Sequence, residues 1–320
     1  MVAKLTDVAK LAGVSPTTVS RVINKKGYLS EKTIKNVIEA MQKLNYKPNN
    51  LARGLQGKSP KLVGLIFPTI GNIFYAELIA YLEKELFNRG YKTIICNSQQ
   101  DSAKEKEYLE MLTANQVDGI ISGSHNLGIK DYDLVTAPII AFDRNLSPST
   151  PIVSSDNYSG GILAAKTLKK AGCLHPIMIT GNNNSNSPTG LRQRGFSSIF
   201  PKAKIYHISS DFSPVRKEIE IRTILKTTKT DGIFISDDLT AILVWNIIQS
   251  LKLSIPQDLK LIGYDGTYFI ETHYPQLTTI KQPLADIAKL MVDLLLQKIE
   301  GSSLEKSYLL PVSLLPGRSV

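Results

Sequence analysis

The sequence is poor in cysteine and contains no long apolar run. Its two cysteines, Cys96 and Cys173, lie far apart in 320 residues, which excludes a disulfide framework and a cysteine-based metal site. No apolar stretch approaches the ~18 residues that a membrane-spanning helix needs. The N-terminal stretch MVAKLTDVAK mixes charged and apolar side chains and does not resemble a secretory signal. These features predict a cytoplasmic protein with buried, reduced thiols and no membrane partner.

Signatures of catalysis are also missing. The chain has no G-x-S-x-G elbow and no G-x-G-x-x-G after a predicted strand. Gly57-Lys58-Ser59 lacks the earlier glycine of a phosphate-binding loop. The four histidines are scattered without metal-ligand spacing: His125, His175, His207 and His273. We therefore expect a protein that is not an enzyme and needs neither a metal nor a cofactor.

Acidic residues are scarce in the first 60 positions. This segment holds eleven Lys or Arg and three acids, so it carries +8 of the total formal charge of +10. A basic head on a nearly neutral body favours a polyanionic partner, although a solvated, lysine-rich helix surface would have the same charge.

What this head does contain is two short helical patterns separated by a turn. We expect the first helix to have Thr6 as its N-cap and to end at Gly13, which can adopt the left-handed conformation. Ser15 is then the N-cap of the second helix, and Pro16 is its first residue. A third helix is predicted over 31–44 from apolar residues at helical spacing. The pattern is that of a helix-turn-helix.

The second helix carries many short polar side chains. Thr17, Thr18 and Ser20 are short enough to approach base edges and phosphates closely. Arg21 can reach guanine or phosphate, and Asn24 can reach phosphate near the helix end. These residues favour a helix that reads double-stranded DNA over a plain three-helix bundle with a Ser/Thr-rich surface.

Two stretches, TDVAKLAGVSPTTVSRVIN and YKPNNLARGL, resemble the head and hinge of the LacI/GalR transcriptional repressors. The resemblance implies that 48–57 forms a hinge helix only when a dimer binds its operator, and that Leu55, beside Ala52, enters the minor groove. Without DNA, 48–60 is expected to be a flexible linker. The expected DNA contacts are Thr6, Ser15, Pro16, Thr17, Thr18, Ser20, Arg21, Asn24, Ala52 and Leu55.

From Lys61 onward, predicted strands alternate with predicted helices. The echo of VDGIISGS in TDGIFISDD indicates two similar halves, hence two doubly wound α/β subdomains. The resemblance implies a fold of the periplasmic-binding-protein type, with three crossovers and a ligand cleft between the halves. We expect a helix over 284–300 and a single closing strand over 307–315. The expected boundaries are 1–47 for the head, 48–60 for the hinge and 61–320 for the effector-binding and dimerisation domain, with subdomains of about 61–158 plus 284–305 and about 159–283 plus 306–320.

The ligand cleft should lie at the carboxyl ends of the strands, where open α/β sheets bind ligands. The resemblance carries effector contacts onto Phe74, Asp143, Arg192, Phe234, Asp237 and Asp265. Carboxylates and a guanidinium suit sugar hydroxyls, and aromatic rings suit the apolar faces of a sugar. Phe234 could instead be a core residue.

Within the family, LARGLQGKS, ANQVDGIIS and APIIAFDRNL are most similar to the sucrose operon repressors of Gram-positive bacteria. This implies repression of sucrose genes, released by a small sugar or sugar phosphate. Two alternatives stay open: a global carbon-catabolite regulator with a phosphocarrier protein as cofactor, and a sugar-binding transport protein, which the basic head disfavours. Because no leucine heptads follow at the end of the sequence, a homodimer is expected rather than a tetramer.

Overall fold

The computed structural model describes residues 3–24, 26–47, 59–124, 126, 130–181, 187–209 and 212–320. The chain divides into two compact units, Met1–Pro60 and Lys61–Val320, which we describe separately.

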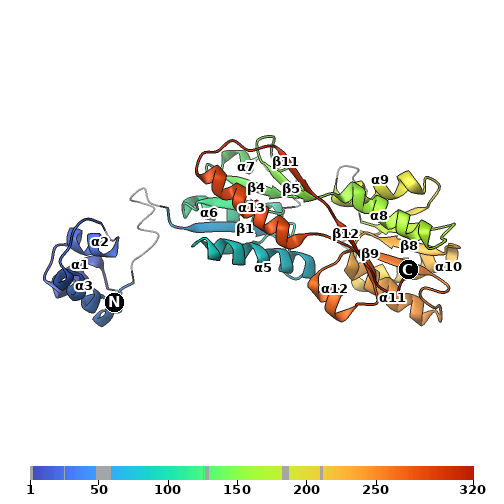
Figure 1. Ribbon diagram of the computed structural model, residues 1–320, viewed down its shortest axis with the longest axis horizontal. Coiled ribbons are helices and arrows are strands. Elements are labelled where there is room, and N and C mark those ends of the chain that lie inside the picture. The colour runs from blue at the N-terminus through green and yellow to red at the C-terminus, as the bar shows by residue number, and fades with distance from the viewer. Residues whose placement is uncertain are drawn as a thin grey trace. The chain divides into compact units, whose positions relative to one another are not determined.

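Within its described residues, the first unit has three helices around a small core (Figure 1). They are α1 (Leu5–Ala12), α2 (Pro16–Ile23) and α3 (Glu31–Lys43). Val8, Val19 and Val37 are fully buried where the three helices meet, and the small side chains of Ala9 and Ala40 let the helices approach closely. This is the predicted helix-turn-helix, with Val19 in the seam between α1 and α2.

The ends of these helices test the predicted caps. Gly13 has φ of 68° and ends α1, and the Ser15 side chain caps α2 ahead of Pro16, as predicted. The prediction that Thr6 is the first N-cap is wrong. Helix α1 begins at Leu5, because the Asp7 carboxylate accepts the Lys4 amide at 2.8 Å and so satisfies the helix start from within its first turn.

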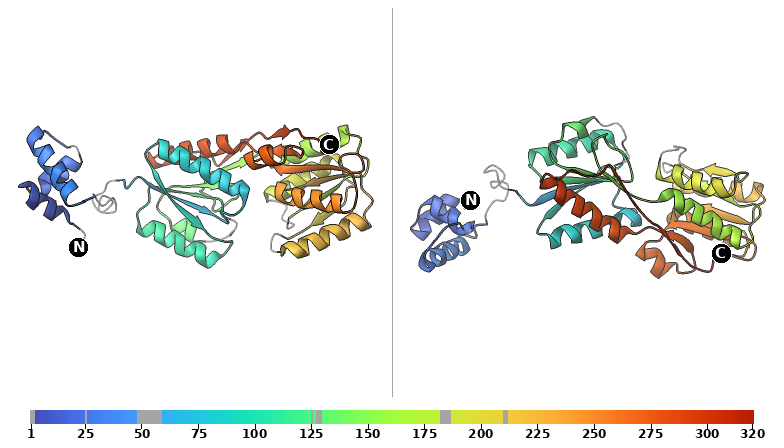
Figure 2. Two further views of the ribbon diagram at one scale, coloured as in Figure 1. Left: turned by 90° about the horizontal axis from the view of Figure 1, so that it is seen from below. Right: turned by 45° about the horizontal axis from the view of Figure 1, so that its top comes forward.

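The second unit contains two six-stranded sheets, each covered by helices on both faces (Figures 1 and 2). The first sheet has the order β11-β5-β4-β3-β1-β2 and is parallel throughout. Helices α5 and α13 cover one face, and α6 and α7 cover the other. Its elements are β1 (Leu62–Phe67), α5 (Ile73–Asn88), β2 (Lys92–Asn97), α6 (Ser102–Ala114), β3 (Gly119–Ser122), α7 (Asp131–Leu134), β4 (Ile139–Phe142), β5 (Ile152–Ser155), α13 (Leu284–Ile299) and β11 (Ser307–Leu310).

The second sheet repeats this plan with the order β12-β10-β9-β8-β6-β7. Strand β12 is antiparallel to β10, and the other pairs are parallel. Helices α8 and α9 cover one face, and α10, α11 and α12 cover the other. Its elements are α8 (Asn157–Lys170), β6 (Ile177–Thr180), α9 (Pro188–Ile199), β7 (Ile205–His207), α10 (Pro214–Thr227), β8 (Gly232–Ile235), α11 (Asp238–Ser250), β9 (Lys260–Asp265), α12 (Tyr268–His273), β10 (Thr278–Lys281) and β12 (Ser313–Leu315).

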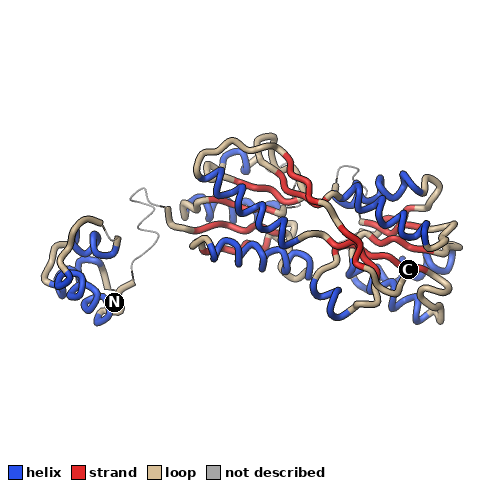
Figure 3. The backbone as a smooth tube through the Cα atoms, viewed as in Figure 1, coloured by secondary structure: helices blue, strands red, loops and turns tan. Residues whose placement is uncertain are grey.

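The chain crosses between the subdomains after β5, after β10 and after β11 (Figure 3). The prediction of one closing strand over 307–315, assigned to the second subdomain from 306 onward, is therefore wrong. Residues 307–310 form β11 beside β5, and 313–315 form β12 beside β10. Pro311 has no amide hydrogen to donate to a ladder, which separates the two strands.

Two glycines allow α8 and α9 to pack closely. A Cβ on Gly161 would overlap the Arg192 carbonyl oxygen, and a Cβ on Gly195 would overlap the Tyr158 carbonyl oxygen. The close approach places the start of α8 beside the second turn of α9. It therefore sets Asn157 next to Arg192, where the candidate site lies.

Candidate functional site

The exposed face of α2 carries the residues predicted to contact DNA. Thr17 and Arg21 are exposed one turn apart on this face. The Ser15 Oγ accepts the Thr18 amide at 3.1 Å and lies 2.9 Å from Thr18 Oγ1. Ser15 and Thr18 thus fix the start of the helix, whereas Thr17 and Arg21 extend from it.

The far end of α2 is closed by a second local interaction. Asn24 Nδ2 donates to the Ser20 carbonyl at 2.7 Å and to Ser20 Oγ at 3.3 Å. Thr6 and Pro16 are exposed at the surface of the same unit. Contacts of these residues with DNA stay predictions. The hinge residues Ala52 and Leu55 lie outside the described residues.

A cavity of about 860 Å³ lies between the two sheets of the second unit. Its wall is formed by the carboxyl ends of strands and the first turns of helices from both subdomains, which is where parallel sheets bind ligands. Most of the predicted effector residues line this cavity: Phe74, Asp143, Arg192, Asp237 and Asp265.

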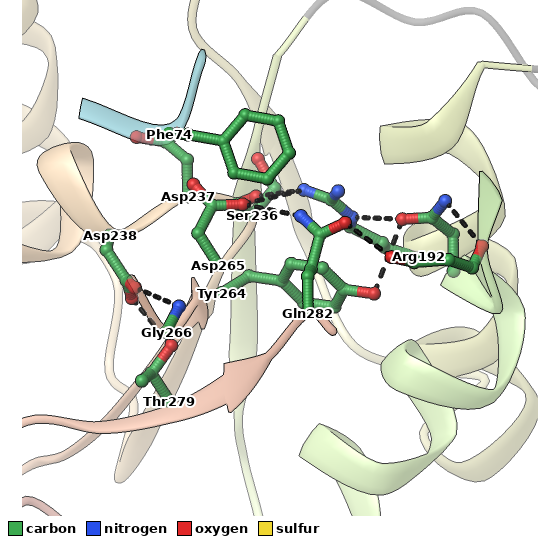
Figure 4. Close-up of polar contacts among 12 residues, drawn as sticks. Phe74, Arg192, Ser236, Asp237, Asp238, Tyr264, Asp265, Gly266, Thr279 and Gln282 are labelled. Carbon is green, nitrogen blue, oxygen red and sulfur yellow. Dashed lines mark hydrogen bonds and ion pairs between the residues drawn. The ribbon is translucent and has the colours of Figure 1, made fainter. Parts of the chain in front are cut away.

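Arg192 is held rigidly at the floor of this cavity (Figure 4). Its Nε donates to Asn157 Oδ1 at 2.8 Å, and its Nη1 donates to the Ser236 carbonyl at 2.6 Å. The guanidinium carbon lies 3.6 Å from the centre of the Tyr264 ring, a cation–π geometry. These contacts leave the remaining guanidinium hydrogens with a fixed direction toward a ligand.

Asp265 ends β9 beside this arginine. Its Oδ1 accepts Gln282 Nε2 at 2.8 Å and lies 4.0 Å from Arg192 Nη1. The Gln282 Oε1 in turn accepts the Ser155 hydroxyl at 2.7 Å, which fixes the amide orientation. Burial raises the pKa of Asp265 well above its ordinary value, and the Arg192 charge opposes that shift. A carboxylate kept this far from water gains much from hydroxyl donors on a ligand.

Asp143 follows β4 on the opposite subdomain. Asn157 Nδ2 donates to its Oδ1 at 3.4 Å, so Asn157 connects Asp143 to Arg192 across the cavity. Burial raises the pKa of Asp143 to about 6, partly offset by the charges of Arg192 and Arg144. The backbone at Asp143 has φ of 60° and that at Asp265 has φ of 129°. Non-glycine residues held in this region cost free energy and concentrate at functional sites.

The two adjacent acids after β8 have different roles. Asp237 lines the cavity and is the N-cap of α11, where its Oδ1 accepts the Thr240 amide at 2.8 Å. Asp238 is 1% exposed and accepts both the Thr279 hydroxyl and the Gly266 amide at 2.7 Å. Burial raises the pKa of Asp238 to about 7. Asp238 is therefore a structural connection between α11, β9 and β10.

The prediction that Phe234 contacts the effector does not agree with its position. Phe234 is 0% exposed, lies in the core under α8 and α9, and packs between the rings of Phe196 and Tyr264. Side chains of a strand alternate between its faces, and Phe234 is on the face of β8 that packs against α8 and α9. Phe234 can act on the cavity only through Tyr264.

Phe74 and Tyr75 form the aromatic side of the cavity. The Phe74 ring centre lies 5.2 Å from that of Tyr75 and 6.0 Å from that of Phe142. Figure 4 shows the Phe74 ring near Arg192 and Asp265. Flat apolar surface therefore meets a rim of carboxylates and a guanidinium, an arrangement suited to the CH faces and the hydroxyls of a sugar.

Three residues that position the site were not predicted: Asn157, Tyr264 and Gln282. The sequence held a signal for each, since all stand within two residues of an expected strand end or crossover. Each, however, has a partner at least 35 residues away along the chain: Arg192 for Asn157, Asn157 for Tyr264 and Ser155 for Gln282.

Comparisons with known proteins agree with this architecture. Residues 4–49 match the model for bacterial regulatory proteins of the lacI family, and 165–320 match the periplasmic binding protein-like domain. The sucrose operon repressor of Streptococcus mutans is 68% identical over 320 residues, which is 100% of both chains. The chain belongs to the LacI family. A second family member, the sucrose operon repressor of Lactococcus lactis, is 54% identical over 97% of this chain and 98% of its own.

Solved structures of LacI-family proteins share the fold. The lac repressor dimer bound to operator and the anti-inducer ONPF has a TM-score of 0.88 at 25% identity, covering 100% of this chain and 99% of that one. A LacI transcriptional regulator from Alkaliphilus metalliredigens, complexed with D-xylulofuranose, has a TM-score of 0.72 at 31% identity, covering 81% and 98%. These matches confirm the predicted fold class of a helix-turn-helix head with two subdomains of the periplasmic-binding-protein type.

Family membership makes the chain a DNA-binding transcriptional repressor with a sugar-binding type of domain, and not an enzyme. Within the part of the chain that the structure covers, no His, Cys, Asp and Glu side chains cluster as a metal site would require. No helix among those described residues is both long and apolar enough to cross a bilayer. Cys96 and Cys173 are both buried thiols, as predicted.

Proposed function

We propose that this protein represses a sucrose-utilisation operon in the cytoplasm and that a sugar bound between its subdomains releases it from the operator. The observation that carries the proposal is the 68% identity, over the whole length, to the sucrose operon repressor of Streptococcus mutans. The cavity supports it, because Asp143, Arg192 and Asp265 present hydrogen-bonding groups beside the Phe74 ring.

On the DNA side, the proposed contacts are made by a homodimer, with α2 of each copy in the major groove. Thr17 and Arg21 would read bases, and the lysines around them would contact phosphates. Leu55 would enter the minor groove as the hinge helix forms, with Ala52 beside it. In this proposal the sugar-binding unit, Lys61–Val320, forms the dimer. Dimerisation brings two copies of the basic unit, Met1–Pro60, to the same operator.

Release requires that the sugar bind the two arrangements of the subdomains with different affinity. The site is suited to this because Asp143 comes from one subdomain and Asp265 and Arg192 from the other. A ligand that bonds to all three changes the relative free energy of open and closed cleft, and hence the spacing of the two hinges across the dimer.

The test is a release assay on the full chain. Duplexes enriched from a random pool by the protein would be labelled, and their binding followed by fluorescence anisotropy while sucrose, fructose, glucose and their phosphates are titrated. We expect enrichment of a palindromic sequence and release by one of these compounds. If no sequence is enriched, or no compound changes the anisotropy, the proposed function is wrong.

A further inference from the structure

One wall of the cavity differs from the rest in its charge. It is formed by the ends of β6 and β7 and the first turns of α9 and α10. The two strands are adjacent, and the Ile208 amide donates to the Thr180 carbonyl at 2.9 Å where they end. Thr180, Ile208 and Pro214 all face the cavity. We call this the β6–β7 wall.

The β6–β7 wall contains a buried hydroxyl that lacks a partner. Thr180 is 4% exposed, and its Oγ1 makes no hydrogen bond within the part of the chain that the structure describes. A buried polar group without a partner is costly, and native structures contain few of them. The oxygen is shielded from solvent, but Thr180 lines the cavity, so a change of its side-chain rotamer would present the hydroxyl to a bound ligand.

The same wall carries a free positive charge. Arg216 and Arg222, the two arginines of α10, pair with Glu220 at 3.9 Å and Glu218 at 2.8 Å. The Lys217 side chain lines the cavity and has no hydrogen bond or ion pair to any described residue. This lysine is half-buried and lines the cavity, so its charge is near enough to act on a ligand there.

The helices that begin at this wall add to the positive potential. Neither α9 nor α10 has an acidic residue in its first turn, so the partial positive charge of each N-terminus is not neutralised. In contrast, α11 begins at the same edge with Asp238 in its first turn and Asp237 as its N-cap. A negative group is therefore favoured at the β6–β7 wall and not beside α11.

The opposite subdomain supplies a second cation to the cavity. Arg144 lines it, and its side chain makes neither a hydrogen bond nor an ion pair with the residues that the structure covers. Arg192, by comparison, is already engaged by Asn157 and the Ser236 carbonyl. A neutral sugar would leave the Lys217 and Arg144 charges without an anionic group of the ligand to pair with.

We infer that the effector is a sugar phosphate, whose phosphate monoester lies at the β6–β7 wall and accepts hydrogen bonds from Thr180 and Lys217. This rests on the proposed function and specifies its ligand. The sugar hydroxyls then meet Asp143, Asp265 and Arg192, and the phosphate carries a charge of about −1.5 to −2 at neutral pH. The volume of about 860 Å³ is large enough for a disaccharide phosphate.

Calorimetric titration of the full-length protein with matched pairs tests the inference: sucrose and sucrose 6-phosphate, fructose and fructose 6-phosphate, glucose and glucose 6-phosphate. For the sugar that binds, we expect the phosphate ester to bind at least ~10-fold more tightly, as loss of a charge-assisted hydrogen bond would imply. Lys217→Met and Thr180→Val should each reduce that preference by about 10-fold and leave the affinity for the unphosphorylated sugar unchanged. Thr180→Ser, which keeps the hydroxyl, should retain the preference.

The matched control is Lys226→Met, which removes the same charge from the exposed last turn of α10. It should bind both members of each pair like the wild type. Unchanged binding of the unphosphorylated sugar by Lys217→Met shows that the variant is folded.

Equal affinities for sugar and sugar phosphate, or a preference that survives Lys217→Met, would overturn the inference. The inference would also be overturned if inorganic phosphate displaced the sugar phosphate at equal concentration, because the β6–β7 wall would then bind a free anion and not the ester. If unphosphorylated sugars release the operator and the esters do not, this inference fails and the proposed function stands. If neither releases it, the proposed function itself fails.

Discussion

Replacing Asp265 by asparagine should give a repressor that a sugar no longer releases. The Asp265 Oδ1 accepts Gln282 Nε2 at 2.8 Å, and an asparagine oxygen can keep that bond in the same place. Asp265 lines the cavity, and its second oxygen becomes an amide nitrogen that donates instead of accepting. Asp265→Asn thus changes one ligand-facing group and preserves the contact to Gln282.

The expected loss follows from the number of bonds to the ligand. Hydrogen bonds to a charged group contribute about 1.5–3 kcal/mol each, so loss of one or two costs about 3 kcal/mol, or ~150-fold in affinity. The fold should be retained, because asparagine can keep the bond to Gln282 and brings no new charge into this buried position. The melting temperature at neutral pH should therefore be no lower than that of the wild type.

Operator release followed by anisotropy is the assay. Asp265→Asn should hold its operator at effector concentrations that fully release the wild type. Asp286→Asn, an exposed acid in the first turn of α13, makes the same chemical change away from the cavity and should behave like the wild type. If Asp265→Asn releases its operator at the same effector concentration as the wild type, Asp265 does not bind the effector and the cavity has been assigned wrongly.

Three further predictions concern the other parts of the structure. Gly161→Ala should lower the free energy of unfolding by about 1–3 kcal/mol and weaken sugar binding, because a Cβ there overlaps the Arg192 carbonyl oxygen. Urea unfolding measures the first effect, and a variant as stable as the wild type would contradict the close packing of α8 and α9. Effector affinity should level off above about pH 7 and fall by up to ~10-fold per pH unit below pH 6, because burial raises the pKa of Asp143 to about 6 and protonation removes its acceptor role. Calorimetry between pH 5 and 8 with an unphosphorylated sugar, whose own charge does not change, measures this. Thr17→Ala should reduce the base preference at one position of each half-site by about 1–3 kcal/mol, whereas Lys10→Ala should weaken binding to all sequences alike. Selection from random duplexes distinguishes the changed preference from the uniform loss of affinity.

The regular part of the fold could be predicted from local pattern. Strands such as β1 and β9 are short apolar runs that are buried on both faces, as a parallel sheet requires. The start of α2 was also visible, because the cap residue Ser15 precedes Pro16. Strands β5 and β10 were not predicted, because half of IVSS and three of the four residues of TTIK are polar; both take their strand conformation from the neighbours they pair with.

The candidate site was predictable by residue type but not by partner. Acids at strand ends gave Asp143 and Asp265, and a polar loop before a helix gave Arg192. Sequence pattern could not show that Asp237 caps α11, nor that Phe234 lies beneath Tyr264, because both depend on the direction in which one side chain leaves the backbone. It also could not show the left-handed backbone of Asp143 and Asp265, which only the surrounding structure imposes.

The contacts beneath the cavity explain how a sugar could act on the arrangement of the subdomains. Asn157, which holds Arg192, begins the chain segment after the first crossover, and Gln282, which holds Asp265, lies in the second. The Ser155 hydroxyl donates to Gln282 at 2.7 Å, so these two crossovers are joined by a direct hydrogen bond. A ligand that draws on Arg192 and Asp265 therefore acts on the two segments about which the subdomains must turn. The ligand-binding groups are therefore anchored on the connections between the subdomains, where a change in their arrangement must begin.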